Sequence, residues 1–303
     1  MESYDLIIVG AGPAGLTAAV YAGRYKLKTL VIGKTIGGIA SKAYEICNFP
    51  TYTKIIGFEF MQKLISQVKD IGIQIKAEEV EEVKKDKHEF KVITNRGGYN
   101  CKRVILALGS KRKKLEIERE DELTGKGISY CATCDAPFYK DKVVGVVGGS
   151  DAALTTSLLL AKFAKKVYII YRQDKFYRAE PAWIDDVKKN SKITPVFNSQ
   201  VIKLFGKEHL EEIEMEKNGK KEKMKLDGIF IEIGSDPNIK LPDKMGIKLD
   251  GDYIDTDKKQ RTSIKGIFAA GDITNNPLKQ IVTACAEGAI ASDTIYRELM
   301  KEE

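Results

Sequence analysis

The first 32 residues alternate between two kinds of hydrophobic pattern. Residues 4–9 form a short apolar run, which is typical of a buried β-strand. Residues 29–32 form a second run, and between the two runs apolar side chains recur at helical spacing, at Leu16, Ala19, Val20 and Ala22. The pattern predicts a strand, a helix and a strand, which is the opening of a doubly wound α/β fold.

The same succession returns in the middle of the chain. Residues 143–147 read VVGVV, a continuous apolar run of the kind found in central parallel strands. A helical pattern follows over residues 154–163, and a further apolar run covers residues 167–170. These segments predict a second strand–helix–strand unit.

A third apolar run lies near the C-terminus, in the segment GIFAAGDITNN. It ends in Gly271-Asp272 and precedes a helical pattern over residues 281–299. An aspartate at such a strand end can accept hydrogen bonds from the hydroxyl groups of a sugar or a ribityl chain. The order of segments predicts a first nucleotide fold that opens, receives a complete second fold and then resumes.

The predicted fold class is therefore α/β, with two dinucleotide-binding, Rossmann-like domains, the second inserted in the first. We expect the outer domain to comprise residues 1–113 and 243–303, and the inserted domain residues 114–242. Two polar segments, residues 111–120 and 234–246, are the candidate hinges.

The turn after the first predicted strand spells G-x-G-x-x-G at Gly10, Gly12 and Gly15. In such a unit the first glycine permits a tight turn, the second lets the backbone approach a pyrophosphate, and the third lets the helix pack on the strand. The helix that starts near Pro13 and Ala14 presents its N-terminus to the phosphates. This segment is the candidate FAD pyrophosphate site.

The second turn matches this fingerprint less closely. Its candidate nucleotide-binding residues are Gly148, Gly149, Ser150, Asp151 and Ala153. Ser150 stands where a glycine is usual, although its side chain is small. The first unit also departs from the fingerprint, because Gly33 and Lys34 occupy the end of the second strand, where an acidic residue would bind the ribose.

Composition excludes several classes of protein. Hydrophobic residues make up 43% of the chain, yet no apolar run approaches the roughly 20 residues that span a bilayer. The net charge of +7 is spread over intermixed basic and acidic residues, and no basic run has interleaved aromatics, so we expect no nucleic-acid groove. The five cysteines are odd in number and scattered, and no basic region precedes the first apolar run; both features indicate a cytoplasmic protein.

Two of these cysteines, Cys131 and Cys134, form a C-x-x-C pair followed by Asp135. The pair could hold zinc, form a structural disulfide or carry out redox chemistry. Zinc needs about four ligands, whereas no second pair exists and the only histidines, His88 and His209, are distant in sequence. A disulfide across two residues closes too small a loop to stabilise the chain much. Redox chemistry is favoured.

The whole set of motifs resembles the low-molecular-weight thioredoxin reductases, which are flavoproteins with two dinucleotide-binding domains. The resemblance rests on GAGPAGLTAAVYAGR, GG followed by E-x-x-N-F-P, ALGS, CATCD and GIFAAGD with KQIVTA, and it covers nearly the whole chain. It implies FAD in the outer domain, a pyridine nucleotide in the inserted domain, and a homodimer. The FAD site implied outside the first turn comprises Gly33, Lys34, Gly37, Gly38, Asn48, Val80, Gly109, Gly271, Asp272, Lys279 and Gln280.

By the same resemblance, Cys134 faces the flavin and Cys131 attacks the disulfide of a thioredoxin-like partner, with Asp135 as the acid–base group. An ionised surface aspartate could not supply a proton near neutral pH, so this role requires burial or a neighbouring thiolate to raise the pKa of Asp135. The alternative is that Asp135 only caps a helix.

The electron donor is the open question. NADPH-specific relatives carry H-R-R-x-x-x-R after the second strand of the inserted domain, whereas this chain has Arg172, Gln173 and Arg178 there, with Tyr171 in place of the histidine. Gln173 replaces one cation of this motif and Arg178 stands one residue late, which predicts weaker binding of a 2′-phosphate. NADPH, NADH, ferredoxin or a deazaflavin could then reduce the flavin.

Two other functions compete. A ferredoxin–NADP reductase of the same fold lacks the cysteine pair, so CATC argues against it. A flavin-binding redox sensor would keep the pair but would not turn over with a thioredoxin.

Overall fold

The computed structural model describes residues 2–86 and 89–302, and it divides the chain into two compact units. The first comprises Met1–Lys111 and Asp236–Glu303, and the second comprises Arg112–Ser235. The predicted insertion of one nucleotide fold in another is confirmed. The division lies at 111/112 and 235/236, whereas composition placed it at 113/114 and 242/243. Helix α7 (Lys240–Lys244) forms across the second expected boundary, so the polar, proline-containing segment there is not wholly a linker.

The first unit is built on a sheet of order β3-β2-β1-β6-β5-β4, with β19 pairing β6. Strands β1, β2, β3, β6 and β19 pair in parallel, and β4, β5 and β6 form an antiparallel meander. The strands are β1 (Ser3–Val9), β2 (Thr29–Ile32), β3 (Gln74–Lys76), β4 (Val80–Asp86), β5 (Glu89–Thr94), β6 (Gly97–Leu106) and β19 (Ile267–Ala269).

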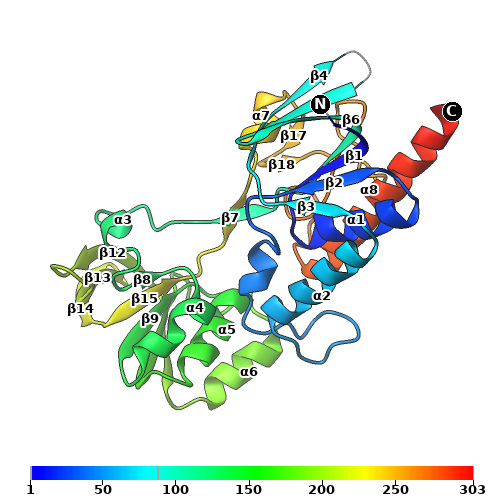
Figure 1. Cartoon of the computed structure of the whole chain (residues 1–303). Coiled ribbons are helices and arrows are strands. Elements are labelled where there is room, and N and C mark those ends of the chain that lie inside the picture. Colours follow the sequence, from blue (N-terminus) through cyan, green and yellow to red (C-terminus); the bar gives the residue numbers. More distant parts are fainter. Residues whose placement is uncertain (1, 87–88, 303) are drawn as a thin grey trace. The chain divides into compact units, whose positions relative to one another are not determined.

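Three helices, α1 (Pro13–Arg24), α2 (Gly57–Asp70) and α8 (Ile281–Glu302), cover one face of this sheet (Figure 1). Buried side chains such as Ile8, Met61 and Ile295 form the core between them. The other face packs on the meander, on α7 and on the hairpin of β17 (Leu249–Asp250) and β18 (Tyr253–Ile254). A short 3-10 helix, η1 (Ile39–Lys42), precedes α2.

The second unit is a parallel five-stranded sheet of order β11-β10-β9-β15-β8. Helix α5 packs on it and α6 packs on α5, while an antiparallel sheet of β12, β13 and β14 closes a second core. The strands are β8 (Ile128–Ser129), β9 (Val143–Val147), β10 (Lys166–Ile170), β11 (Ile193–Val196), β12 (Ser199–Phe205), β13 (Glu212–Lys217), β14 (Lys220–Lys225) and β15 (Gly228–Ile231); the helices are α3 (Glu120–Leu123), α4 (Ala132–Asp135), η2 (Ala136–Tyr139), α5 (Asp151–Leu160) and α6 (Pro181–Lys189).

Helix α5 lies three residues closer to the N-terminus than the predicted 154–163. It begins directly after the glycine turn, where the N–H of Leu154 donates to the carbonyl of Ser150. It ends before a turn that leads the chain into β10. Sequence pattern alone did not distinguish this apolar turn from another helical turn.

The two segments that connect the units pair with each other. They are β7 (Ser110–Arg112) and β16 (Ser235–Pro237), and they form a two-stranded ribbon. The chain therefore enters and leaves the inserted unit through one paired connection, which overlaps both predicted hinge segments.

Candidate active site

The first glycine turn follows β1 and leads into α1. Gly10 has φ +120°, and a Cβ there would lie 2.0 Å from the carbonyl oxygen of Ala107. A Cβ on Gly15 would lie 1.9 Å from the carbonyl oxygen of Gly10. Both glycines are therefore demanded by the fold itself, as the turn and the helix–strand contact of the fingerprint require.

Gly12 is different. Its φ of −89° suits any residue, and a Cβ there would meet no atom nearer than the Cα of Gly38, at 4.0 Å. Neither backbone conformation nor protein packing demands glycine at the N-terminus of α1. The open space in front of this helix fits a pyrophosphate that approaches the backbone closely.

The loop of Gly37 and Gly38 lies against this turn. Both have positive φ, +92° and +59°, and the N–H of Gly37 donates to the carbonyl of Ala11 at 2.8 Å. Further along, the side-chain amide of Asn48 donates to the Oε1 of Gln280 at 3.1 Å. The structure thus brings Asn48 and Gln280 together, as a shared flavin site would need.

The end of β2 has no acid of its own. A Cβ on Gly33 would lie 2.8 Å from the backbone nitrogen of Ala11, so packing demands glycine here. Lys34 forms an exposed ion pair with Glu79 at 2.8 Å, next to Val80 at the start of β4. A carboxylate therefore reaches this strand end from Glu79, which sequence reasoning did not select. Gly109, also proposed for the FAD site, has φ +59° and open space where a Cβ would be.

A buried glutamate holds the turn that carries Asp272. Glu287 of α8 accepts hydrogen bonds from the N–H of Gly271 at 2.7 Å, from the hydroxyl of Thr274 at 2.9 Å and from the side chain of Asn276. It is 4% exposed. Its partners lie 11–16 residues away in sequence, so no local pattern pointed to it.

The charges around Asp272 oppose one another. Burial raises the pKa of Asp272, Lys279 counteracts this, and Glu287 adds to it. Burial also lowers the pKa of Lys279, whose ammonium lies 4.1 Å from the ring centroid of Tyr253 and donates to the carbonyl of Thr274. A half-buried acid and base therefore lie together beside the N-terminus of α8.

The second glycine turn, after β9, contains an aromatic neighbour. A Cβ on Gly148 would lie 2.1 Å from the carbonyl oxygen of Glu232, and one on Gly149 would lie 2.5 Å from the ring of Tyr171. Ala153 is fully buried on α5. Gly149 is therefore a glycine because the ring of Tyr171 packs against its backbone.

The segment after β10 folds back to the start of α5. The backbones of Ser150 and Arg178 form a bridge, and the carboxylate of Asp151 accepts the N–H of Glu180 at 2.6 Å. The side chains of Arg172, Gln173 and Arg178 are exposed. The structure brings Arg178 to the second turn, despite its late position in the motif.

A second buried acid lies at the carboxyl end of β15. Glu232 forms an ion pair with Arg112 at 2.6 Å and accepts a hydrogen bond from the hydroxyl of Thr156 at 3.1 Å. Burial raises its pKa, and Arg112 opposes the rise. Glu232 therefore places a carboxylate next to Thr156 from another element of the inserted unit.

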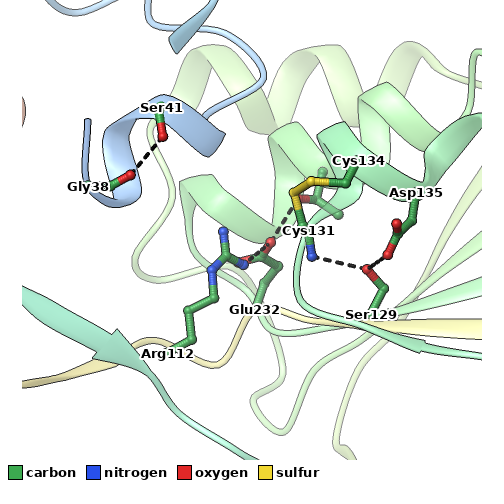
Figure 2. Close-up of a disulfide and its surroundings, with 9 residues drawn as sticks. Gly38, Ser41, Arg112, Ser129, Cys131, Cys134, Asp135 and Glu232 are labelled. Atoms are coloured by element: carbon green, nitrogen blue, oxygen red, sulfur yellow. Dashed lines mark hydrogen bonds and ion pairs between the residues drawn. A yellow bond between two sulfur atoms is a disulfide. The ribbon is translucent and has the colours of Figure 1, made fainter. Parts of the chain in front are cut away.

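Cys131 and Cys134 form a disulfide, with their Cα atoms 5.3 Å apart. Cys134 lies in the short helix α4, and Cys131 precedes that helix as its N-cap residue (Figure 2). No group of three or more histidine, cysteine or acidic side chains in residues 2–86 and 89–302 could hold a metal, while His88 lies outside these residues. The bonded sulfurs favour the predicted redox role of the pair.

The remaining cysteines lie outside this pair. Cys101 is buried, and burial raises the pKa of its thiol to about 12. Burial also raises the pKa of Cys285, which lies on α8 with its sulfur 3.9 Å from the carbonyl oxygen of Pro13. Cys47 is exposed.

Asp135 is the last residue of α4 and is half-buried. Its carboxylate accepts a hydrogen bond from the hydroxyl of Ser129 at 2.6 Å. It forms no side-chain cap on the 3-10 helix that follows. The alternative that Asp135 only caps a helix is therefore wrong.

No helix in the described part of the chain is both long enough and apolar enough to cross a membrane.

Comparison with known proteins gives one consistent result. The family model described as pyridine nucleotide-disulphide oxidoreductase matches residues 4–288. The chain is 38% identical over 306 residues to thioredoxin reductase from Listeria monocytogenes, an alignment that covers 99% of this chain and 95% of the relative. Its structure matches that of Lactococcus lactis thioredoxin reductase with a TM-score of 0.95 and 33% identity, over 98% and 99% of the two chains.

The structure is also similar to that of a ferredoxin-flavin thioredoxin reductase from Clostridium acetobutylicum, with a TM-score of 0.55 and 30% identity, over 99% of each chain. The name of this relative contains a different reductant, ferredoxin. The resemblance inferred from the motifs is confirmed. The chain belongs to the pyridine nucleotide-disulphide oxidoreductase family, in which it groups with the low-molecular-weight thioredoxin reductases as an FAD-dependent disulfide oxidoreductase.

Proposed function

We propose that the chain is a thioredoxin-disulfide reductase, which passes electrons from a reductant through FAD and the Cys131/Cys134 dithiol to a thioredoxin-like protein. The observation that carries the proposal is the Cys131–Cys134 disulfide with Asp135 beside it. A protein partner suits the surroundings, because Cys134 is exposed and Phe138 is 74% exposed four residues further on. An exposed aromatic ring beside a redox pair offers apolar contact area to a macromolecule.

The residues that would hold FAD are those of the first unit. Gly12 and the N-terminus of α1 would receive the pyrophosphate, and Asp272 would accept hydrogen bonds from the ribityl hydroxyls. Asn48 and Gln280, linked by their hydrogen bond, would lie at the flavin ring. FAD, when bound and reduced by the donor, would pass two electrons to the disulfide.

The dithiol then completes an exchange in which atoms and electrons balance. Cys131, as thiolate, attacks one sulfur of the partner disulfide, so that a mixed disulfide forms and the other partner sulfur leaves as thiolate. Cys134 attacks the sulfur of Cys131, which re-forms the intramolecular disulfide and releases the second partner thiolate. The dithiol loses two electrons and two protons, and the partner gains both.

Asp135 is the proposed carrier of one of these protons. It would take the proton from the thiol of Cys131 before the attack and return it to a leaving thiolate. Both acid and base forms are needed within a turnover, so the local environment must keep the two within reach at neutral pH.

We propose NADPH as the leading donor, with a weaker preference over NADH than full-motif relatives have. Arg172 and Arg178 are exposed cations near the second glycine turn, while Gln173 contributes no charge. Ferredoxin or a deazaflavin is the second candidate donor. The similarity to a ferredoxin-flavin thioredoxin reductase supports ferredoxin as a candidate. A homodimer in the cytoplasm is proposed from the family resemblance and from the scattered cysteines.

The donor is identified by anaerobic titration of the oxidised holoprotein, with flavin bleaching as the readout. The titrants are NADPH, NADH, reduced ferredoxin and reduced deazaflavin. Multiple turnovers with thioredoxin then separate an enzyme from a redox sensor. Phe138→Ala should lower kcat/KM for thioredoxin but leave the reduction of a small aromatic disulfide unchanged. Failure to turn over thioredoxin with any of the four donors would refute the proposed function.

A further inference from the structure

Ser129 links the proposed acid–base group to the dithiol turn. It is the last residue of β8 and is 4% exposed. Its hydroxyl donates to the carboxylate of Asp135 at 2.6 Å and accepts the backbone N–H of Cys131 at 3.0 Å. Figure 2 shows the carboxylate of Asp135 turned toward Ser129.

These contacts have a fixed direction. A serine hydroxyl has one proton, so Ser129 donates to Asp135 and receives from Cys131. The carbonyl of Cys131 in turn accepts the N–H groups of Cys134 and Asp135, both at 3.1 Å. The dithiol turn, Ser129 and Asp135 therefore form one closed set of hydrogen bonds.

The set is anchored in the sheet of the inserted unit. Strand β8 pairs in parallel with β15, where Ser129 lies opposite Phe230. Ser129 is therefore placed by backbone pairing, independently of the cysteines. The side chain of Asp135 is therefore oriented by a residue of the sheet, whereas its own backbone lies at the end of the four-residue helix α4.

We propose that Ser129 is a positioning residue of the thiol–disulfide exchange, which holds the carboxylate of Asp135 beside the dithiol turn. The proposal rests on the acid–base role of Asp135 in the proposed function. The hydroxyl of Ser129 contacts both the carboxylate of Asp135 and the backbone N–H of Cys131, so it fixes the acid–base group relative to the attacking residue.

The balance of the step is that of the exchange itself. Asp135 receives the thiol proton as the sulfur of Cys131 bonds to a substrate sulfur, and the substrate S–S bond breaks. The leaving thiolate takes the proton back from the carboxylic acid of Asp135.

The test is a single-turnover reaction that needs neither a physiological donor nor thioredoxin. The FAD-loaded protein is reduced with dithiothreitol, freed of it anaerobically and mixed with the small aromatic disulfide DTNB from pH 5 to pH 9. The released thiolate is followed by absorbance. All variants carry Cys47→Ser, because the exposed Cys47 thiol would also react.

Asp135→Asn should slow this exchange, because it removes the proposed proton acceptor. Ser129→Ala should slow it by about ten- to a hundredfold, the loss expected for one hydrogen bond to a charged group. It should cause no further loss in the Asp135→Asn background, because Ser129 acts through Asp135. Ser129→Thr, which keeps the hydroxyl, should keep a rate near that of the wild type. Ser129→Gly repeats the Ala test if the Ala protein does not fold.

A wild-type rate in folded Ser129→Ala would overturn the proposal, as would a Thr variant as slow as Ala or an equal further loss in the Asp135→Asn background. A wild-type rate in Asp135→Asn would overturn it together with the role of Asp135. The assignment of thioredoxin as substrate fails separately: the wild-type protein would then reduce DTNB but not thioredoxin.

Discussion

Gly12 offers a direct test of whether a glycine serves the fold or a ligand. A methyl group at this position would meet nothing closer than the Cα of Gly38, at 4.0 Å, which is ordinary van der Waals contact. We therefore expect Gly12→Ala to fold without its cofactor. Alanine allows the unfolded chain fewer conformations than glycine does, which stabilises the folded variant by about 0.4–1 kcal/mol. Alanine is a poorer N-cap than glycine, at a cost of about the same size. The free energy of unfolding of the apoprotein should change by less than about 1 kcal/mol.

The effect on FAD should be far larger. The methyl group projects into the space before α1 where the pyrophosphate would accept backbone N–H groups. Each hydrogen bond to a charged group contributes roughly 1.5–3 kcal/mol. Displacing the phosphate from one such donor should therefore weaken FAD binding about 10- to 150-fold, since each 1.4 kcal/mol is about tenfold.

Gly10→Ala is the matched control. Its Cβ would lie 2.0 Å from the carbonyl oxygen of Ala107, at a φ of +120° that L-residues rarely adopt. Overpacking alone costs about 1–3 kcal/mol, and backbone strain adds to it. Thermal unfolding of the apoproteins and FAD titration by flavin fluorescence separate the two effects. Gly12→Ala protein that binds FAD as tightly as wild type would refute the assignment of this turn to the pyrophosphate.

Cys131→Ser and Cys134→Ser should each abolish thioredoxin reduction and retain FAD; a long-wavelength charge-transfer band should appear in Cys131→Ser, and its appearance in Cys134→Ser instead would reverse the two thiol roles. Burial raises the pKa of Asp272, so the stability of the folded apoprotein falls as pH rises from the ordinary carboxyl pKa toward the raised one. The melting-temperature advantage of Asp272→Asn over wild-type apoprotein should therefore grow from about pH 4 to pH 7, and a constant difference would contradict the shift. Gln173→Arg should strengthen NADPH binding by about tenfold and Arg172→Ala should weaken it while sparing NADH, both measured by the nucleotide concentration that half-bleaches the flavin; equal effects on both nucleotides would exclude a 2′-phosphate site.

The sequence was sufficient for the architecture because its signals are local. Apolar runs marked β1, β2, β9 and β10, and glycines at fixed spacing marked the turns that follow β1 and β9. The structure shows why that spacing is informative at Gly10 and Gly15, where any side chain would overlap backbone atoms of the turn itself. Such steric demands come from neighbouring segments of one motif and leave a short, recognisable pattern.

The buried acids could not be found in this way. Glu287 is surrounded by a helix pattern, and Glu232 follows an apolar strand; each is defined by partners from other elements. Thr156 and Glu232 are 76 residues apart, and Arg112 lies on the connecting strand. In the sequence, a lone acid after an apolar run indicates only the end of a strand. Its role becomes visible when the fold places its partners around it. Ser129 is the exception, since it stands two residues before Cys131 and a hydroxyl at that spacing can reach the backbone of the pair.

The two ends of the electron path are therefore specified in different ways. The dithiol end is encoded in seven consecutive residues, from Ser129 to Asp135, whose hydrogen bonds close on one another. The donor end depends on exposed side chains of the segment after β10, which contacts the second turn chiefly through backbone groups and one ring. Changing Gln173 or Arg172 alters no contact of the dithiol set, so donor preference can vary while the exchange chemistry stays the same. It follows that a variant with an altered donor should keep the wild-type pH profile with DTNB, and a coupled change in both would show that the two ends are linked through the inserted unit.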